Sequence, residues 1–342
     1  MKRYSNILLC LCFPLLMFLT GCLDEDVRTI VNADGSSERI YSVQISGKEF
    51  PESGFPRPYD GSWTIRTDSN RTCTARKKFA TPEALSNEYA GARDTGIVGL
   101  NVSINKRFEW FYTYLDYRET YVMRNRLVSV PVTDFMTKDE IDRYVRGDTS
   151  DALKHKVDAW DYRNMYEAFF AELVAETQRR NDRELPPALL NGKKEEFYRG
   201  ILVGDSINTA NKKKDGDTTK KGLDDKYILD LSVKVFGTNA ILKYEAFADT
   251  TIKQIAGKQD PGGHPDNWSS SVQMPGILLA TNSASVEGNS ASWKFASKQI
   301  HVGEYVMTAS SRVTNVWTFI VTGIVALMVV ALGVVRMAKR RR

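Results

Sequence analysis

Ser206 is the residue whose setting most suggests nucleophilic chemistry. It ends the short run Leu-Val-Gly-Asp-Ser at positions 202–206. A serine becomes a nucleophile when a histidine, itself oriented by a carboxylate, takes its proton. His264 is the candidate base, because Asp260 precedes it by four residues. Gly-Asp-Ser is also an ordinary turn sequence, so the same residues fit a structural role.

Residues 201–208 resemble the nucleophile block of the GDSL/SGNH hydrolases, in which a strand delivers a serine whose backbone N–H helps to form an oxyanion hole. Residues 237–239 are faintly similar to the later Gly-x-Asn block of that family. The chain departs from the pattern, because Ala240 stands where an Asp follows that block and the Asp–His spacing is four rather than three. The resemblance implies a serine hydrolase with Ser206 as nucleophile, which we keep as the alternative function.

Metal and cofactor sites are not predicted. The three histidines, His155, His264 and His301, are scattered, and no cysteine–histidine spacing suits zinc. Asp215 and Asp217 flank a glycine but lack the other ligands and the closing glutamate of a calcium loop. No glycine-rich loop with a downstream lysine is available to cradle phosphate.

The elements that would position any such site are organised around the C-terminal stretch. Residues 316–335 contain no charged side chain, and the basic segment 336–342 follows directly. A helix of this length spans roughly 30 Å, the thickness of the hydrocarbon core of a bilayer. The run is apolar on all sides, unlike a helix on the surface of a soluble domain. The sequence therefore predicts a transmembrane helix over 316–335 and a basic cytoplasmic tail over 336–342.

The N-terminus predicts a second anchor. Lys2 and Arg3 precede an apolar segment over residues 7–19, as in a signal peptide. The string Leu-Thr-Gly-Cys at 19–22 resembles the lipobox of bacterial lipoproteins. That resemblance implies removal of residues 1–21 and attachment of palmitate-type lipid to Cys22. The alternative is an ordinary secretory signal with a chance cysteine.

Charge sets the expected topology. Both basic ends should stay cytoplasmic, which places residues 22–315 outside the inner (cytoplasmic) membrane. Residues 23–26 resemble an acidic surface-export signal of some lipoproteins, whereas the apolar helix favours retention in the inner membrane. Of 47 basic residues, two lie in 1–21 and five in 316–342, which leaves 40 against 42 acidic residues between them. The exported part is therefore near −2, and this balance excludes nucleic acid as an expected partner.

The expected fold is α+β and β-rich. Strands are predicted over 27–31 and 39–45 around an Asn-x-Asp-Gly-Ser turn, over a long hairpin at 97–104 and 107–122, and over 272–282, 291–295 and 305–311. The hairpin prediction rests on Phe108, Trp110, Tyr112 and Tyr114, which alternate at period two. Cys73 is left alone once the N-terminal cysteines are assigned, so the domain is expected to fold without a disulfide.

A helical middle is expected between these strands. Thr81 and Pro82 mark one helix start, and a capping box begins at Thr137. Aromatic residues recur at helical spacing over 161–180, where an ordinary core face is favoured over a ligand cavity. Residues 205–225 are predicted as a mobile, Lys-rich loop. Leu229 to Val235 alternates and is predicted as a strand, which turns into another at 241–248.

The last block of the ectodomain, with Met-Pro-Gly-Ile at 274–277 and Trp293 before a C-terminal span, resembles the LppM-type bacterial membrane lipoproteins. Residues 27–36 are similar to the opening of that family, while 60–225 exceed its usual compact domain. The resemblance implies an α+β ectodomain that contacts envelope lipids, and it supplies no catalytic residues.

The expected function is a doubly anchored envelope lipoprotein, a non-catalytic module that binds membrane lipids or a membrane protein partner. Both terminal strands are expected near the bilayer, paired in one sheet that brings Thr29 beside Thr308. Trp293 and Trp317 are expected at the membrane interface, where an apolar ring with a wet N–H is favoured.

Overall fold

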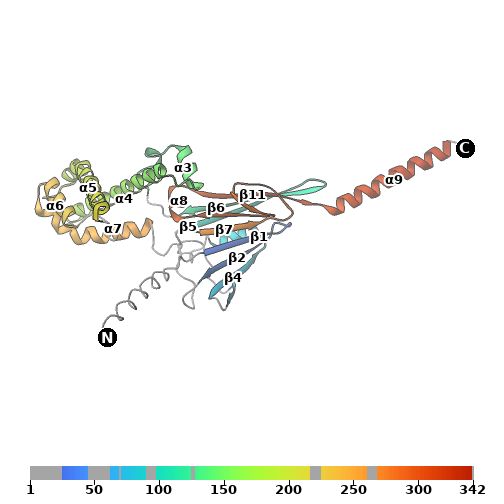
Figure 1. The fold of residues 1–342 in the computed structure, drawn as a ribbon, viewed down its shortest axis with the longest axis horizontal. Helices are drawn as coiled ribbons and strands as arrows, with labels where there is room; N and C mark the ends of the chain where they lie inside the picture. The colour runs from blue at the N-terminus through green and yellow to red at the C-terminus, as the bar shows by residue number, and fades with distance from the viewer. Residues whose placement is uncertain are drawn as a thin grey trace, which may run out of the picture. The chain divides into compact units, whose positions relative to one another are not determined.

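A computed structural model describes residues 25–44, 62–68, 71–89, 98–124, 128–215, 225–259 and 268–340 (Figure 1). The chain divides into two compact units. The first combines Met1–Arg124, Val145–Gly147 and Gly262–Arg342, and the second combines Asn125–Tyr144 and Asp148–Pro261. The predicted fold class is confirmed: mostly antiparallel sheets form from both ends of the chain, the middle is helical, and an apolar helix follows the last strand.

The first unit contains a seven-stranded sheet in the order β3-β4-β2-β1-β7-β10-β9. Its neighbours pair antiparallel except β1 and β7, which run parallel. Side chains of the central strands alternate between buried and accessible because one face of the sheet packs inward. The strands are β1 (Glu25–Val31), β2 (Ser37–Gln44), β3 (Thr64–Thr67), β4 (Thr72–Phe79), β7 (Trp268–Gln273), β9 (Ser285–Glu287) and β10 (Ser290–Phe295).

A four-stranded antiparallel sheet, in the order β5-β6-β11-β8, forms the other layer. Its strands are β5 (Val98–Phe108), β6 (Tyr112–Met123), β8 (Ile277–Thr281) and β11 (Tyr305–Thr314). The predicted hairpin is confirmed, but its turn lies at 109–111, where Glu109 and Tyr112 exchange backbone hydrogen bonds of 2.8 and 3.0 Å. The alternating aromatic residues therefore surround the hairpin tip instead of lining one strand.

Aromatic rings hold the two sheets face to face. The Tyr121 ring centroid lies 6.3 Å from that of Trp268 and 5.0 Å from that of Phe295, which stacks on Tyr305 at 3.9 Å. Each such ring removes a large apolar area from water. Helices α2 (Pro82–Glu88) and α8 (Ser297–Val302) also belong to this unit. The predicted start of α2 is confirmed, because the Thr81 side chain accepts the N–H of Ala84.

The predicted pairing of the two terminal strands is wrong. β1 belongs to the seven-stranded sheet, and β11 belongs to the four-stranded sheet, so Thr29 and Thr308 are not neighbours on paired strands. Trp293 is also misassigned, because its side chain is only 5% exposed and donates to Asn282 Oδ1 at 3.0 Å. Trp317 is exposed, and its position at a membrane interface stays a prediction. The alternation of apolar and polar residues in the strands at each end of the chain could be predicted from the sequence. The assignment of these strands to sheets could not, because it depends on pairing between residues far apart in the sequence.

Gly276 links the two sheets at the start of β8. Its φ is +72°, and an added Cβ would lie 2.2 Å from the carbonyl oxygen of Arg312. We expect Gly276→Ala to destabilise the unit by at least about 2 kcal/mol, because backbone strain and a backbone clash add. Thermal unfolding in detergent measures this. Gly35→Ala is the matched control, since φ is +95° there but no heavy atom lies within 4 Å; an equal loss at both positions would contradict the clash.

The second unit is helical. It contains α3 (Lys138–Val145), α4 (Asp151–Arg179), α5 (Pro187–Asp215), α6 (Asp225–Phe236) and α7 (Glu245–Gln259), with 3-10 turns η2 (Val132–Asp134) and η3 (Asn239–Tyr244). The capping box at Thr137 is confirmed by its reciprocal bonds with Glu140. The aromatic stripe of α4 packs with α5, α6 and η3 in one core that includes Tyr166, Phe170, Phe197, Phe236 and Tyr244, which confirms the core interpretation.

Two predictions fail in this unit. Residues 229–235 are part of helix α6 and not a strand, and 241–248 form η3 and the start of α7. Ile228, Leu231, Val233 and Val235 all contact the helical core. Leu229, with Leu231, Val233 and Val235, gives the apolar alternation that suggested a strand. The predicted loop 205–225 is helical through Asp215 in α5, and 216–224 lie outside the described residues.

Candidate functional site

The predicted nucleophile does not have the local structure that its family requires. Ser206 lies well inside α5, whereas a hydrolase nucleophile block needs a strand that ends in a sharp turn. His264 and Cys22 are outside the described residues. Ser206 therefore lacks the strand and turn that the catalytic interpretation requires. Lipid attachment at Cys22 stays a prediction.

The other residues considered for chemistry are dispersed. His155 is exposed on α4, while His301 is buried in α8 with its Nδ1 3.2 Å from the sulfur of Met123. Within the described ranges, no group of three or more His, Cys, Asp or Glu side chains could hold a metal ion. Cys73 is a buried core residue of β4.

A charged network lies in the interior between the two sheets. Arg39 of β2 and Glu119 of β6 form an ion pair at 3.0 Å, with side chains 1% and 0% exposed. Arg39 also donates to Thr29 Oγ1 at 3.1 Å and to the Tyr121 hydroxyl at 3.0 Å. Tyr117 donates to the second carboxylate oxygen of Glu119. Each charge thus has several partners, as buried charges need.

The pKa values of this network follow from burial and mutual charge. Burial alone would lower the pKa of Arg39, but the Glu119 carboxylate raises it well above its usual value. Burial and the same carboxylate raise the pKa of both Tyr117 and Tyr121. Arg39 therefore stays charged and both phenols stay protonated at neutral pH. The network joins the two sheets, and paired polar groups fill the part of the interior around Arg39 and Glu119.

The outer face of the seven-stranded sheet is accessible to solvent. Because side chains alternate between the two faces, hydroxyl and charged side chains of successive strands lie on this outer face. They include Thr64, Arg66, Thr74 and Arg76 at one edge, and Arg28, Ser271 and Ser292 on the strands further across the sheet. Two hollows of about 530 and about 600 Å³ lie on this face. In the larger one, Arg28 donates to Gln273 and is flanked by Asp26 and Glu287, so its charges are mixed.

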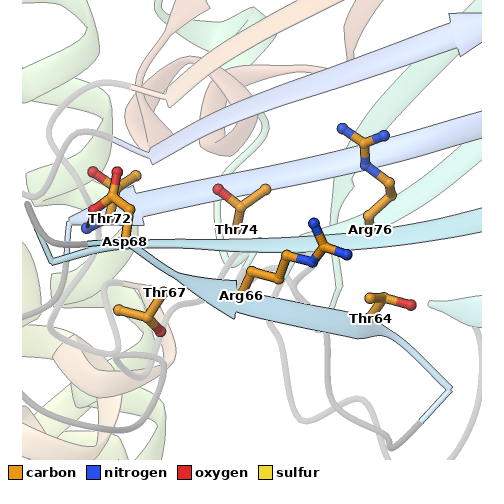
Figure 2. Close-up of a pocket in the computed structure, with 7 residues that line it drawn as sticks. All are labelled: Thr64, Arg66, Thr67, Asp68, Thr72, Thr74 and Arg76. Atoms are coloured by element: carbon orange, nitrogen blue, oxygen red, sulfur yellow. Dashed lines mark hydrogen bonds between the residues drawn. The ribbon is translucent and has the colours of Figure 1, made fainter.

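The smaller hollow is more cationic. Figure 2 shows Arg66 of β3 and Arg76 of β4 rising from adjacent strands toward the same side. Their register makes them diagonal neighbours, because Thr64 faces Arg76 and Arg66 faces Thr74. Arg76 lies 3.6 Å from Glu38, a loose and exposed ion pair.

Arg66 forms no ion pair within the part of the chain that the structure describes. Asp68 at the rim accepts the backbone N–H of Thr72 at 2.9 Å, so part of its carboxylate serves the turn. Threonines 64, 67, 72 and 74 line the remaining wall. Two guanidinium groups among hydroxyl donors suit an anionic group, because guanidinium planes and O–H donors match phosphate or carboxylate oxygens.

A third feature is the junction with the apolar helix α9 (Val316–Arg340). Asn315 stands between β11 and α9, and its Nδ2 donates to the carbonyl oxygens of Glu109 and Trp110 at 2.9 and 3.3 Å. Its Oδ1 accepts from Thr113 at 2.9 Å. This residue therefore ties the hairpin tip to the start of α9. The helix is long and apolar enough to cross a membrane, and only 6% of the residues in its most apolar stretch are buried.

The sequence contained signals for two of these features. Parity along β2 places Arg39 on the same face as Tyr41 and Val43, and an arginine directed into a core requires a buried partner. The same parity assigns Thr72, Thr74 and Arg76 to the accessible face. Asn315 had no comparable signal, because its role depends on the position of a hairpin tip distant in sequence.

Comparison with known proteins identifies no family. No protein-family model matches the chain, and no curated protein matches it. Among solved structures, the NMR structure of the folded domain of the Mycobacterium tuberculosis LppM protein aligns over 87% of this chain and 93% of that chain, at 12% identity and a TM-score of 0.28. At this TM-score the match establishes no common fold, and the LppM-type resemblance stays an expectation from the sequence. What the residues themselves define is a two-sheet unit with a charged interior, a hydroxyl-rich cationic outer edge and an apolar C-terminal helix.

Proposed function

We propose that this chain is a membrane-anchored, non-catalytic binding protein of the bacterial envelope, and that its seven-stranded sheet binds an anionic group of an envelope lipid or polymer. The observation that carries the proposal is the hollow between Arg66 and Arg76. Two like charges on diagonal positions repel each other, and an anion placed between them relieves that repulsion. The surrounding threonine hydroxyls supply further donors to its oxygens.

Location follows from α9. Its uncharged stretch and the basic residues after it support insertion in the inner membrane with the folded units on the extracytoplasmic side. Lipid on Cys22 would add a second anchor. A binding role is preferred to a hydrolase because the cationic hollow offers donors for an anion, while Ser206 stands inside a helix.

The test is calorimetric titration of the full chain in detergent with sn-glycerol 3-phosphate. Arg66→Ala should weaken binding about 10-fold or more, since a charge-assisted hydrogen bond contributes about 1.5–3 kcal/mol. Arg76→Ala should cost less, because Glu38 already competes for that guanidinium. Arg118→Ala, an exposed arginine on the outer face of the four-stranded sheet, is the matched control and should bind as the wild type does.

Titration with different phosphate-bearing probes distinguishes a soluble phosphate from a phosphate at the bilayer surface. Binding of glycerol phosphate and inorganic phosphate assigns a soluble or projecting phosphate, while binding only to phosphatidylglycerol vesicles assigns the bilayer surface. Equal binding by wild type, Arg66→Ala and Arg76→Ala would overturn the site. Labelling of Ser206 by a fluorophosphonate, abolished by His264→Ala, would overturn the non-catalytic assignment.

A further inference from the structure

The tip of the β5–β6 hairpin exposes aromatic side chains beside α9. Phe108 and Trp110 are 54% and 48% exposed, although residues of this size are usually buried. The same rings contact the first turns of the helix: Phe108 and Trp110 lie 6.2 and 5.6 Å from Trp317, and Phe111 lies 4.6 Å from Phe319, measured between centroids. The tip therefore follows the helix away from the strands.

One hydrogen bond gives the depth of this contact. Trp110 Nε1 donates to Thr322 Oγ1 at 2.9 Å. Thr322 is six residues beyond Val316, or about 9 Å along the helix axis. A residue bonded at that level lies beside lipid if the helix spans a bilayer from its first residue.

We propose that residues 108–111 are a second membrane-contacting element, an aromatic wedge that enters the outer leaflet beside α9. This inference rests on the proposed anchoring by α9. This role differs from simple support of the helix. Residues that only support α9 could pack on it outside the bilayer, whereas an aromatic wedge must contact the acyl chains.

The backbone carbonyl oxygens of residues 109–111 are already paired, which favours entry into lipid. Glu109 and Tyr112 bond each other, and Asn315 covers the carbonyl oxygens of Glu109 and Trp110. The indole N–H of Trp110 is covered by Thr322. A turn whose polar groups are paired in this way enters an apolar medium at much lower cost than an open loop.

Cations lie at the level just above the aromatic tip. Arg107 lies 5.0 Å from the Tyr114 ring and 3.3 Å from the Glu109 carboxylate, and Arg312 lies 4.8 Å from the Tyr112 ring. Aromatic rings with arginines on the water side are the arrangement that suits the boundary between acyl chains and phosphate headgroups. The pairing of Glu109 with Arg107 also reduces the cost of bringing its charge to that boundary.

Tryptophan fluorescence can test the wedge without added labels. Of the six tryptophans, Trp63, Trp160, Trp268 and Trp293 are at most 5% exposed, which leaves Trp110 and Trp317 as the accessible ones. The full chain is reconstituted in phosphatidylcholine vesicles with or without lipid brominated on its acyl chains. Trp317→Phe then reports Trp110, Trp110→Phe reports Trp317, and the double variant gives the buried background.

Brominated lipid is expected to quench the Trp110 signal of Trp317→Phe at least twofold after subtraction of the double-variant background. Quenching of Trp110→Phe with no quenching of Trp317→Phe would overturn the wedge and leave the α9 anchor intact. Absence of quenching in both single variants would overturn the anchor as well. Phenylalanine preserves an aromatic ring at each site, so the variants are expected to keep the fold. A change in quenching then reports contact with lipid and not unfolding.

Discussion

Glu119→Ala is expected to lower the free energy of unfolding of the first unit by about 3–5 kcal/mol. The substitution leaves the Arg39 guanidinium charged and buried, with the neutral hydroxyls of Thr29 and Tyr121 as acceptors in place of a carboxylate. The Tyr117 hydroxyl loses its acceptor at the same time. An uncompensated interior charge is among the most costly defects that one substitution can create.

Denaturant unfolding followed by tryptophan fluorescence measures this effect, since Trp268 lies in contact with Tyr121. Glu287→Ala is the control: Glu287 is exposed on β9, and its loss should change stability by less than about 0.5 kcal/mol. The double variant Arg39→Met with Glu119→Leu should recover much of the loss, because it removes both charges and keeps volume. A cost below about 1 kcal/mol for Glu119→Ala would show that solvent reaches the pair.

The strands at the chain ends could be predicted because each has one face in the core. Tyr41 and Val43 alternate with accessible neighbours, and this alternation survives any choice of partner strand. Partner choice itself was not predictable. β1 pairs with β7 across more than two hundred residues, and no local pattern distinguishes β7 from β11 as its neighbour.

The middle of the chain shows the limit of periodicity as a signal. Between residues 227 and 236, apolar side chains occupy enough positions to satisfy both a period of two and a helical period. The helix forms because Leu231 and Val235 join the core that Phe170 and Phe197 already define. Tertiary packing therefore decides an assignment that the local sequence leaves ambiguous.

The candidate binding surfaces were less predictable than the fold. Arg66 and Arg76 become neighbours only through the register of β3 on β4. The aromatic tip was expected in the right residues but on a strand face, because period two alone does not locate a turn. The proposed binding surfaces thus depend on strand register and turn position, which are the properties hardest to predict from the sequence.

The sheet register relates the start of β1 to the start of α9. Glu25 faces Trp268 in the sheet, Trp268 faces Phe295, and Phe295 stacks on Tyr305. Tyr305 begins β11, whose ten residues extend about 30 Å to Thr314 beside α9. β1 therefore begins at the end of the strands that is far from α9.

Loss of membrane retention is expected only when α9 and Cys22 are removed together, because either anchor alone should hold the chain. A chain that carries Cys22→Ala should stay in the alkali-washed membrane pellet, held by α9, because a spanning helix inserts effectively irreversibly. A chain that ends at Asn315 and carries Cys22→Ala should appear entirely in the supernatant. The same truncation with Cys22 intact is the control and should remain lipid-bound. A mature Cys22→Ala truncation that still pellets would contradict the two-anchor proposal, whereas full release of the Cys22→Ala chain that retains α9 would show that this helix does not span the membrane.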